Sequence, residues 1–212
     1  MINLNIEKEE GLNQYSFFLI HDYIQILYIM IIDNIPNFIQ RIIKNSEDDF
    51  YVPVHGCSLC GYAGNLHRHA SYSRNVICEN ITARVKIQRV ICPSCHKTHA
   101  ILPAELIPYY QHTLVTILKL IELIKVKHET YSEIIKSFRN INPCLCEAHI
   151  NFYMRRFNSN YNRVLYYFRT VMNYIPNPQN CGAAVMLDKI NENPYEFNKN
   201  YFCHMPKFFL AK

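Results

Sequence analysis

The chain has 212 residues, of which 50% are hydrophobic, and a formal net charge of +5 at pH 7. This composition excludes a wholly disordered chain and suffices for one large domain or two small ones. The positive excess is mild, but its distribution is uneven. Acidic residues cluster within 1–60, whereas Arg and Lys are frequent in 68–97 and 119–169, so these two later ranges are the parts compatible with an anionic partner.

An apolar stretch covers residues 14–44. Polar side chains break it before any run approaches the eighteen or so residues that a membrane span needs, so we expect no membrane partner. The residues that interrupt or close the run are His21, Asp22, Gln25 and Asp33. The pattern predicts an apolar N-terminal helix that continues after Pro36 through Ile39, Ile42 and Ile43. Because it is apolar on nearly every side, we expect it to pack in a homo- or hetero-oligomer.

Two CxxC pairs, Cys57/Cys60 and Cys92/Cys95, are separated by a segment long enough for a β-hairpin. This spacing lets two thiolates face one tetrahedral Zn²⁺, and the layout is that of a zinc ribbon. Four thiolates leave no open coordination position, so the ion would be structural. Buried free thiols, disulfides and a redox CxxC are the alternatives. An odd total of nine cysteines and the lack of a signal peptide favour metal binding in a reducing, cytoplasmic compartment.

Other metal ligands compete in sequence. Cys95 and His99 have an acceptable ligand spacing, whereas Cys78 falls near the expected hairpin turn, far from the knuckles. The remaining candidates are His67, His69 and His96.

The hairpin itself is predicted from period-two alternation. A polar strand covers 66–76, and residues 81–91 alternate β-branched and polar side chains. One face of the hairpin would be apolar and the other basic, and a third strand would follow the second knuckle. The basic residues are Arg68, Arg74, Arg84 and Lys86. They could contact phosphates, or they could only keep exposed strands soluble and unpaired.

Beyond Pro103 and Pro108 the period changes to that of helices. We expect a first helix over 113–128 and a second after Thr130, where Thr130 and Glu133 form a capping box. Asn142 and Pro143 predict the start of a third helix over about 143–157. A fourth would begin at Asn158 or Ser159 and end near Tyr174, and an Asn- and Pro-rich tail would follow.

The third helix carries a polar stripe at steps of four, made by Glu147, Asn151 and Arg155 with Arg156 beside them. A short helix, a turn and a second helix with such a stripe is typical of a helix-turn-helix in a major groove. Asn can hydrogen-bond adenine, Arg guanine and Glu cytosine. The alternative is a plain helical bundle with a solvated face.

The resulting fold class is α+β: a four-cysteine zinc ribbon followed by an all-α helix-turn-helix bundle and preceded by an apolar N-terminal helix. We expect four segments, namely 1–50 as helix and linker, 51–104 as ribbon, 105–176 as helix-turn-helix bundle and 177–212 as tail.

This order of elements resembles the amino-terminal DNA-binding region of bacterial insertion-sequence transposases, and more closely a family of short stand-alone proteins of uncharacterised function related to them. The likeness covers about residues 52–170. It is carried by Cys57-x-x-Cys60, His69-Ala70-Ser71-Tyr72-Ser73-Arg74, Arg89-Val90-Ile91-Cys92-Pro93-Ser94-Cys95, Thr98-His99-Ala100, Leu102-Pro103 and the helices up to Phe157. The resemblance implies binding to double-stranded DNA.

Such transposases continue into a nuclease domain with three separated carboxylates that hold two metal ions. Here Asp188 and Glu192 are too close together and too isolated for that site. We therefore expect no catalysis, and a free-standing DNA binder or an accessory product of a mobile element. The alternative is a zinc-ribbon module for protein–protein interaction in an oligomeric complex. An enzyme built on a Cys/His pair lacks a local nucleophile signature.

Overall fold

The structure is a computed structural model of the whole chain, and it describes residues 30–33, 37–43, 53–78, 81–175, 182–205 and 207–211. The predicted N-terminal apolar helix falls largely on residues 14–29, which lie outside the described residues, and so does its expected role in oligomerisation. Among the helices that are described, none combines the length and the apolar character needed to cross a membrane.

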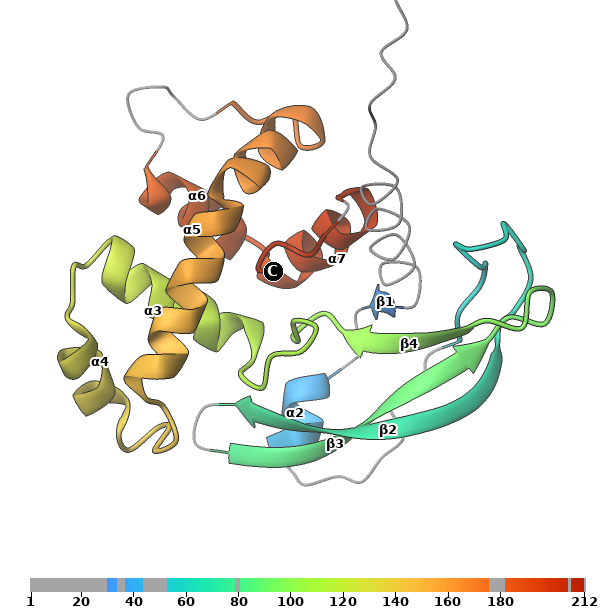
Figure 1. Cartoon of the computed structure of the whole chain (residues 1–212), viewed down its shortest axis with the longest axis horizontal. Coiled ribbons are helices and arrows are strands. Elements are labelled where there is room, and N and C mark those ends of the chain that lie inside the picture. The colour runs from blue at the N-terminus through green and yellow to red at the C-terminus, as the bar shows by residue number, and fades with distance from the viewer. Residues whose placement is uncertain are drawn as a thin grey trace, which may run out of the picture.

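A four-stranded sheet forms one half of the molecule (Figure 1). The strands β2 (His67–Cys78), β3 (Ile81–Ile91) and β4 (Thr98–Pro103) are antiparallel neighbours. The alternation of exposed and buried residues along β3 is the period-two pattern that predicted it. The hairpin and the third strand are therefore confirmed.

A fourth strand, β1 (Met30–Asp33), joins β4 in parallel and completes the order β1-β4-β3-β2. These residues were expected to be helical, so this part of the N-terminal prediction is wrong. Instead, the backbone groups of these residues pair with the free edge of β4. The helix expected after Pro36 is present as α2 (Phe38–Ile43), and Phe38 and Ile42 are buried in a core that also includes Ile87 of β3.

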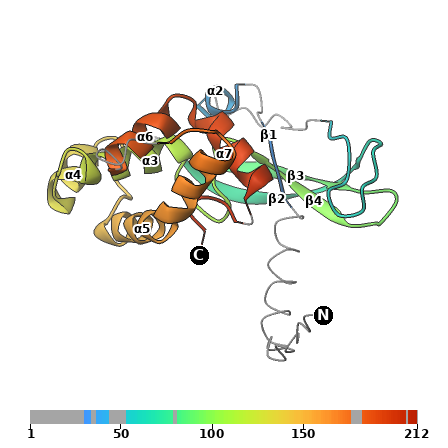
Figure 2. The ribbon, with the colours of Figure 1, turned by 90° about the horizontal axis from the view of Figure 1, so that it is seen from above.

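Five helices make up the other half of the molecule. Figures 1 and 2 show α3 to α6 beyond one end of the sheet, while the loops that carry the cysteine pairs lie at its opposite end. The helices are α3 (Leu114–Lys125), α4 (Tyr131–Phe138), α5 (Glu147–Thr170), α6 (Ala183–Asn191) and α7 (Pro194–His204).

The capping box at the start of α4 is confirmed. The Thr130 hydroxyl accepts a hydrogen bond from the Glu133 backbone N–H, and the Glu133 carboxylate accepts one from the Thr130 backbone N–H at 2.8 Å. Both contacts satisfy amides that have no partner within the helix.

The predicted third and fourth helices are wrong as separate elements, because residues 147–170 form the single helix α5. Its N-cap is Cys146, whereas Asn142 is buried ahead of it. Ser159 lies in the middle of the helix, where its hydroxyl donates to the Arg155 carbonyl oxygen at 2.8 Å. A serine that bonds the carbonyl four residues earlier stays compatible with a continuous helix instead of capping a new one.

The C-terminal segment is also not an irregular tail, since it contains α6 and α7. Apolar residues of both helices and of the final segment belong to the helical core, among them Met186, Phe197, Tyr201, Phe209 and Leu210. Asn193 caps α7 and Pro194 follows it, which is the arrangement that was expected at Asn142 and Pro143.

The connector between β4 and α3 joins the two halves through its carbonyl oxygens. The Asn198 amide of α7 donates to Ala104 at 2.9 Å and to Leu106 at 3.1 Å. Arg74 of β2 donates to Ile107 at 2.6 Å and also to Tyr110. Buried carbonyls are costly without partners, so these two side chains hold the sheet, the connector and α7 together.

Glu105 is a buried acidic residue of this connector that destabilises the fold when it is ionised. It is 8% exposed, and its Oε2 atom has no hydrogen-bond partner among the described residues. Burial raises the pKa of the carboxyl to about 7. The folded state therefore holds the proton more tightly than the unfolded state, in which the pKa is near 4.5.

This difference predicts a pH dependence of stability. The free energy of unfolding should fall as the pH rises from about 4.5 to about 7, by at most about 1.4 kcal/mol per pH unit from this group, and should then level off. Glu105→Gln removes the titration and should stabilise the chain at pH 8 relative to wild type. Urea unfolding at pH 5 and pH 8 measures both effects. An equal pH dependence in wild type and variant would contradict the prediction.

Candidate metal centre and nucleic-acid interface

The two CxxC turns have the same backbone geometry. The Cys57 amide donates to the Tyr62 carbonyl at 2.7 Å, and the Cys92 amide donates to the Lys97 carbonyl at 2.9 Å. In each turn the residue after the second cysteine has a positive φ, +73° at Gly61 and +57° at His96. Glycine adopts this conformation freely, while His96 adopts it at some cost. The repeated turn points both sulfurs of each pair in one direction.

The four sulfurs converge. All Sγ atoms of Cys57, Cys60, Cys92 and Cys95 lie within 4.8 Å of one another. The Sγ atoms of Cys57 and Cys95 are 3.7 Å apart, and so are those of Cys60 and Cys92. A tetrahedral ion with metal–sulfur bonds of about 2.3 Å requires sulfurs about 3.8 Å apart. These four cysteines could therefore hold one metal ion.

The thiols of the cluster differ in pKa. Burial raises the pKa of the Cys57 thiol, whereas a backbone hydrogen bond from Tyr62 lowers the pKa of Cys60 to about 7. A bound cation deprotonates all its thiol ligands.

His99 is the additional residue at this centre. It is fully buried, and its Nε2 lies 3.4 Å from the Cys57 Sγ. With four sulfurs already present, this nitrogen is placed to donate a hydrogen bond to a thiolate and not to replace one. Cys78 pairs with Ile81 at the far end of the hairpin, away from the cluster, as expected. Within the described part of the chain, the only group of three or more potential ligands is the four cysteines.

The basic residues of the hairpin do not share one face. The register pairs Lys86 with Ser73 and Arg84 with Asn75, so these two exposed cations lie on one face. Arg74 pairs with Val85 and therefore lies on the other face. Its guanidinium is engaged by the connector carbonyls. The expectation that Arg74 joins Arg84 and Lys86 in one surface is wrong. Arg68 is exposed and pairs with Val90 beside the bulge in β2.

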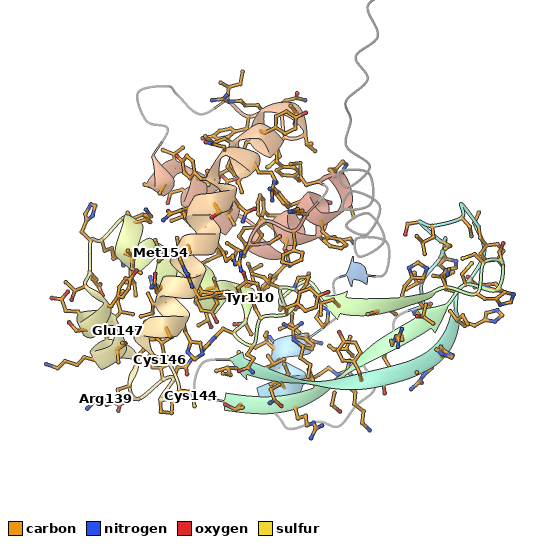
Figure 3. The ribbon with its side chains drawn as sticks, in the orientation of Figure 1. Tyr110, Arg139, Cys144, Cys146, Glu147 and Met154 are labelled. Atoms are coloured by element: carbon orange, nitrogen blue, oxygen red, sulfur yellow. The ribbon has the colours of Figure 1, made fainter. Side chains whose placement is uncertain are left out.

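The polar stripe of the third predicted helix is exposed on α5. Glu147, Asn151 and Arg155 are all exposed, while Ile150, Met154 and Phe157 between them are buried in the helical core. Figure 3 shows Glu147 at the start of α5, next to Cys146, with Met154 two turns along. The stripe continues through the rest of the helix with Asn158, Asn162 and Arg169.

Arg156 is half-buried and lies outside this stripe. Its guanidinium carbon is 5.0 Å from the centroid of the Phe152 ring, in cation–π geometry. Glu147 has a second role, because an acidic residue in the first turn stabilises the positive end of the helix dipole.

Helices α3, α4 and α5 pack against one another in all three pairs. Residues 139–146 connect α4 to α5 and make a longer connection than the three- or four-residue turn of a typical helix-turn-helix.

Comparison with known proteins gives one partial match. Residues 57–139 match the family model of a domain of unknown function (DUF6431), which is less than half of the chain. The matched region begins at Cys57 and ends just after α4, so it includes all four cysteines and stops before α5. No curated protein and no solved structure matches the chain.

The geometry predicts one thiolate-bound metal ion per chain. Cys92→Ser should lower the bound metal and the melting temperature, because one of four ligands is lost and the hairpin is no longer crosslinked. Cobalt reconstitution, followed by sulfur-to-metal charge-transfer absorption, and metal analysis of the purified chain measure this. Cys144→Ser is the matched control, since Cys144 is exposed and outside the cluster. Unchanged metal content in Cys92→Ser would contradict the assignment.

Proposed function

We propose that the chain is a zinc-stabilised DNA-binding protein. The zinc component is supported by four cysteine sulfurs at tetrahedral spacing. Zn²⁺ is commonly bound by four cysteines in structural sites. With four protein ligands no position is left for water or substrate, so the ion would stabilise the zinc ribbon and not catalyse a reaction.

The observation that carries the DNA-binding component is the exposed stripe of Glu147, Asn151 and Arg155 in the first half of α5. Recognition helices place their N-terminal residues against base edges in the major groove. Helices α3 and α4 support α5 through mutual packing, as the two preceding helices of a helix-turn-helix unit do. The long connection 139–146 makes this an extended variant of that arrangement.

Phosphate contacts would come from the zinc-ribbon cations Arg68, Arg84 and Lys86, all of which are exposed. Such contacts position a protein on DNA without selecting sequence. Arg74 and Arg156 have structural roles instead of phosphate contacts. Arg74 holds the connector, and Arg156 stacks on the Phe152 ring.

The transposase relationship rests on the sequence resemblance over about residues 52–170, and we propose a non-catalytic, transposon-derived or accessory protein of the cytoplasm. Asp188 and Glu192 are one turn apart on α6, where Glu192 forms an ion pair with Lys189. That position gives no support to a two-metal nuclease centre.

A protein-interaction module is the second candidate, and it is favoured by exposed apolar residues. Tyr166 is 59% exposed, and Met172 and Ile175 follow it at 39% and 74%. These side chains lie at the C-terminal end of α5 and just beyond it, away from the Glu147–Arg155 stripe. A partner that docks there would depend on a different part of α5 from DNA.

Replacing Arg155 tests the base contacts. Arg155→Ala should weaken binding to a selected duplex by about 1–3 kcal/mol and relax the preference at one base pair. Arg169→Ala, which removes the same charge near the other end of α5, is the control and should have a smaller effect. The measurement is fluorescence anisotropy with oligonucleotides obtained by selection. Absence of duplex binding at low salt would exclude the proposal, and loss of a protein partner on Tyr166→Ser would then favour the second candidate.

Replacing the zinc-ribbon cations tests the phosphate contacts separately. The double variant Arg84→Gln, Lys86→Gln should weaken binding to all duplexes alike, because phosphate contacts release counterions without selecting sequence. The slope of log affinity against log salt should become shallower by about one to two units. Titrations from about 50 to 200 mM salt measure the slope. An unchanged slope would show that these cations only keep the strand edge soluble.

A further inference from the structure

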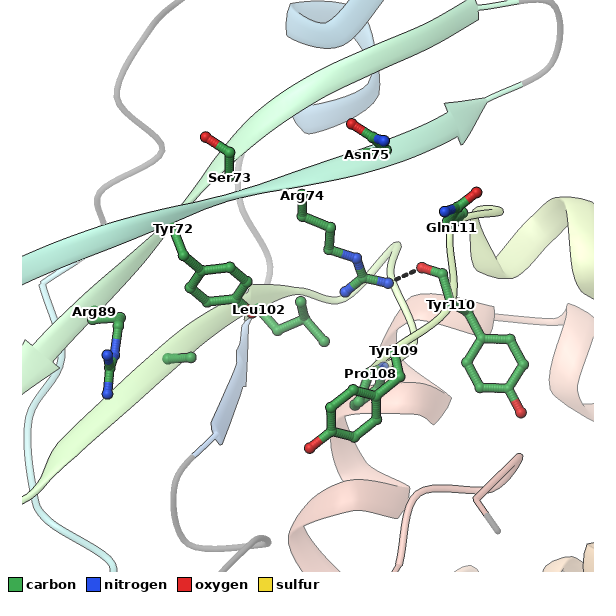
Figure 4. Close-up of a pocket in the computed structure, with 11 residues that line it drawn as sticks. Tyr72, Ser73, Arg74, Asn75, Arg89, Leu102, Pro108, Tyr109, Tyr110 and Gln111 are labelled. Carbon is green, nitrogen blue, oxygen red and sulfur yellow. Dashed lines mark hydrogen bonds between the residues drawn. The ribbon is translucent and has the colours of Figure 1, made fainter.

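A pocket of about 530 Å³ lies between the sheet and the connector, and its volume is within the range of small-ligand sites. None of its lining residues belongs to α5, so it is separate from the stripe proposed to contact duplex DNA. Figure 4 shows side chains from β2, β3, β4 and residues 108–111 around it. The residues used below are Tyr72, Arg74, Arg89, Tyr109 and Gln111.

The charge of the pocket is unbalanced. Arg74 and Arg89 line it, and no acidic residue does. The acceptors that the described residues supply to these guanidiniums are neutral: two connector carbonyls for Arg74 and the Thr98 hydroxyl for Arg89. Burial lowers the pKa of Arg74, yet a guanidinium keeps its proton in proteins. Two such cations without a carboxylate attract an anion, and their forked donors suit phosphate.

The pocket also presents aromatic rings. Tyr72 is 40% exposed and Tyr109 is 73% exposed. Burial raises the pKa of the Tyr72 hydroxyl, and the positive charges of Arg74 and Arg89 act against this shift. Figure 4 shows the Arg74 side chain between the rings of Tyr72 and Tyr110.

Tyr109 has an unusual backbone for an exposed aromatic residue. Its φ is +69°, in the left-handed region that bulky residues rarely adopt. Such conformations persist where the surrounding structure imposes them, and they cluster at binding sites. Here the connector is anchored on one side of Tyr109 through Ile107 and on the other through Tyr110, both held by Arg74. The strained turn keeps the Tyr109 ring at the rim of the pocket.

We propose that this pocket binds one unpaired nucleotide, with its phosphate attracted by the positive charges of Arg74 and Arg89 and its base stacked on Tyr109. Base stacking on tyrosine tolerates any base, while Gln111 offers an amide group to a base edge. A free nucleoside monophosphate and a nucleotide at an unpaired strand end share this chemistry. The proposal goes beyond duplex binding by α5 and does not depend on it.

Two substitutions separate the roles of base and phosphate. Tyr109→Asn removes the ring and keeps a residue that tolerates positive φ, so the connector should remain folded. Arg89→Gln removes one charge, while Arg74 is left intact because it anchors the connector. Arg139→Gln is the matched control, since Arg139 carries the same charge, is exposed at the end of α4 and does not line the pocket. Circular dichroism and thermal unfolding confirm that each variant is folded.

The experiment uses the full chain with its metal. One arm measures binding of thymidine monophosphate by calorimetry at low salt, with inorganic phosphate as a comparison ligand. The other compares a blunt duplex with the same duplex carrying three unpaired nucleotides. Tyr109→Asn and Arg89→Gln should each weaken binding on the order of tenfold in whichever arm detects it, and Arg139→Gln should leave binding unchanged in both arms.

The outcomes are distinct. Binding of the monophosphate identifies the free nucleotide as a ligand, and a preference for the unpaired end identifies strand ends. Absence of binding in both arms would overturn the proposal. Equal affinity for inorganic phosphate, or wild-type affinity in Tyr109→Asn, would also overturn it. If the pocket proposal fails in this way, an affinity for blunt duplex that depends on Arg155 still stands. The two functions are therefore tested separately.

Discussion

The convergence of four sulfurs from two distant turns is the constraint on which the sheet depends. The turns at Cys57 and Cys92 sit at one end of the hairpin, and the core beside them contains few buried residues, among them Leu66, Val90 and Ile101. A core this small contributes little by burial alone. A shared metal would close the loop between the turns and order the hairpin at the same time. The buried His99 fits that role, since its Nε2 lies within hydrogen-bonding distance of the Cys57 sulfur.

A second set of contacts carries that order to the helices. Connector carbonyls accept from Arg74 on the sheet and from Asn198 on α7, and the Tyr110 hydroxyl donates to the Leu210 carbonyl near the C-terminus. Each contact joins residues far apart in sequence, and each satisfies a polar group that burial would otherwise penalise. Shift of the hairpin register by one residue would move Arg74 to the opposite face. The position of the connector, and with it the pocket beside Tyr109, thus depends on the register.

Local patterns predicted the parts of this fold whose causes are local. Alternation gave β3, and the Thr130–Glu133 spacing gave the start of α4, because the stabilising contacts lie within a few residues. Two other predictions failed because contacts with residues distant in the sequence determine the local structure there. Asn142 is buried instead of capping a helix, and in the described segment 182–205 Asn198 is buried and hydrogen-bonded to the connector. The cap at Asn193 could be identified from the sequence. The polar composition of the surrounding segment, however, gave no indication that Phe197 and Tyr201 pack in the helical core. The cysteine cluster was predictable from spacing alone, whereas the orientation of Arg74 required the strand register.

The extent of the family match separates the two candidate binding surfaces. The match to the domain of unknown function includes the cysteine turns, strands β2, β3 and β4 and the connector with Tyr109, but ends at Arg139, before the stripe on α5. The pocket is therefore built entirely within the matched unit, and the stripe entirely outside it. Since α5 packs on α3 and α4 through buried residues such as Ile150 and Phe157, its exposed face can change without disturbing the unit beneath. Substitutions there should alter recognition while leaving metal binding and the pocket intact, because no stripe side chain takes part in either.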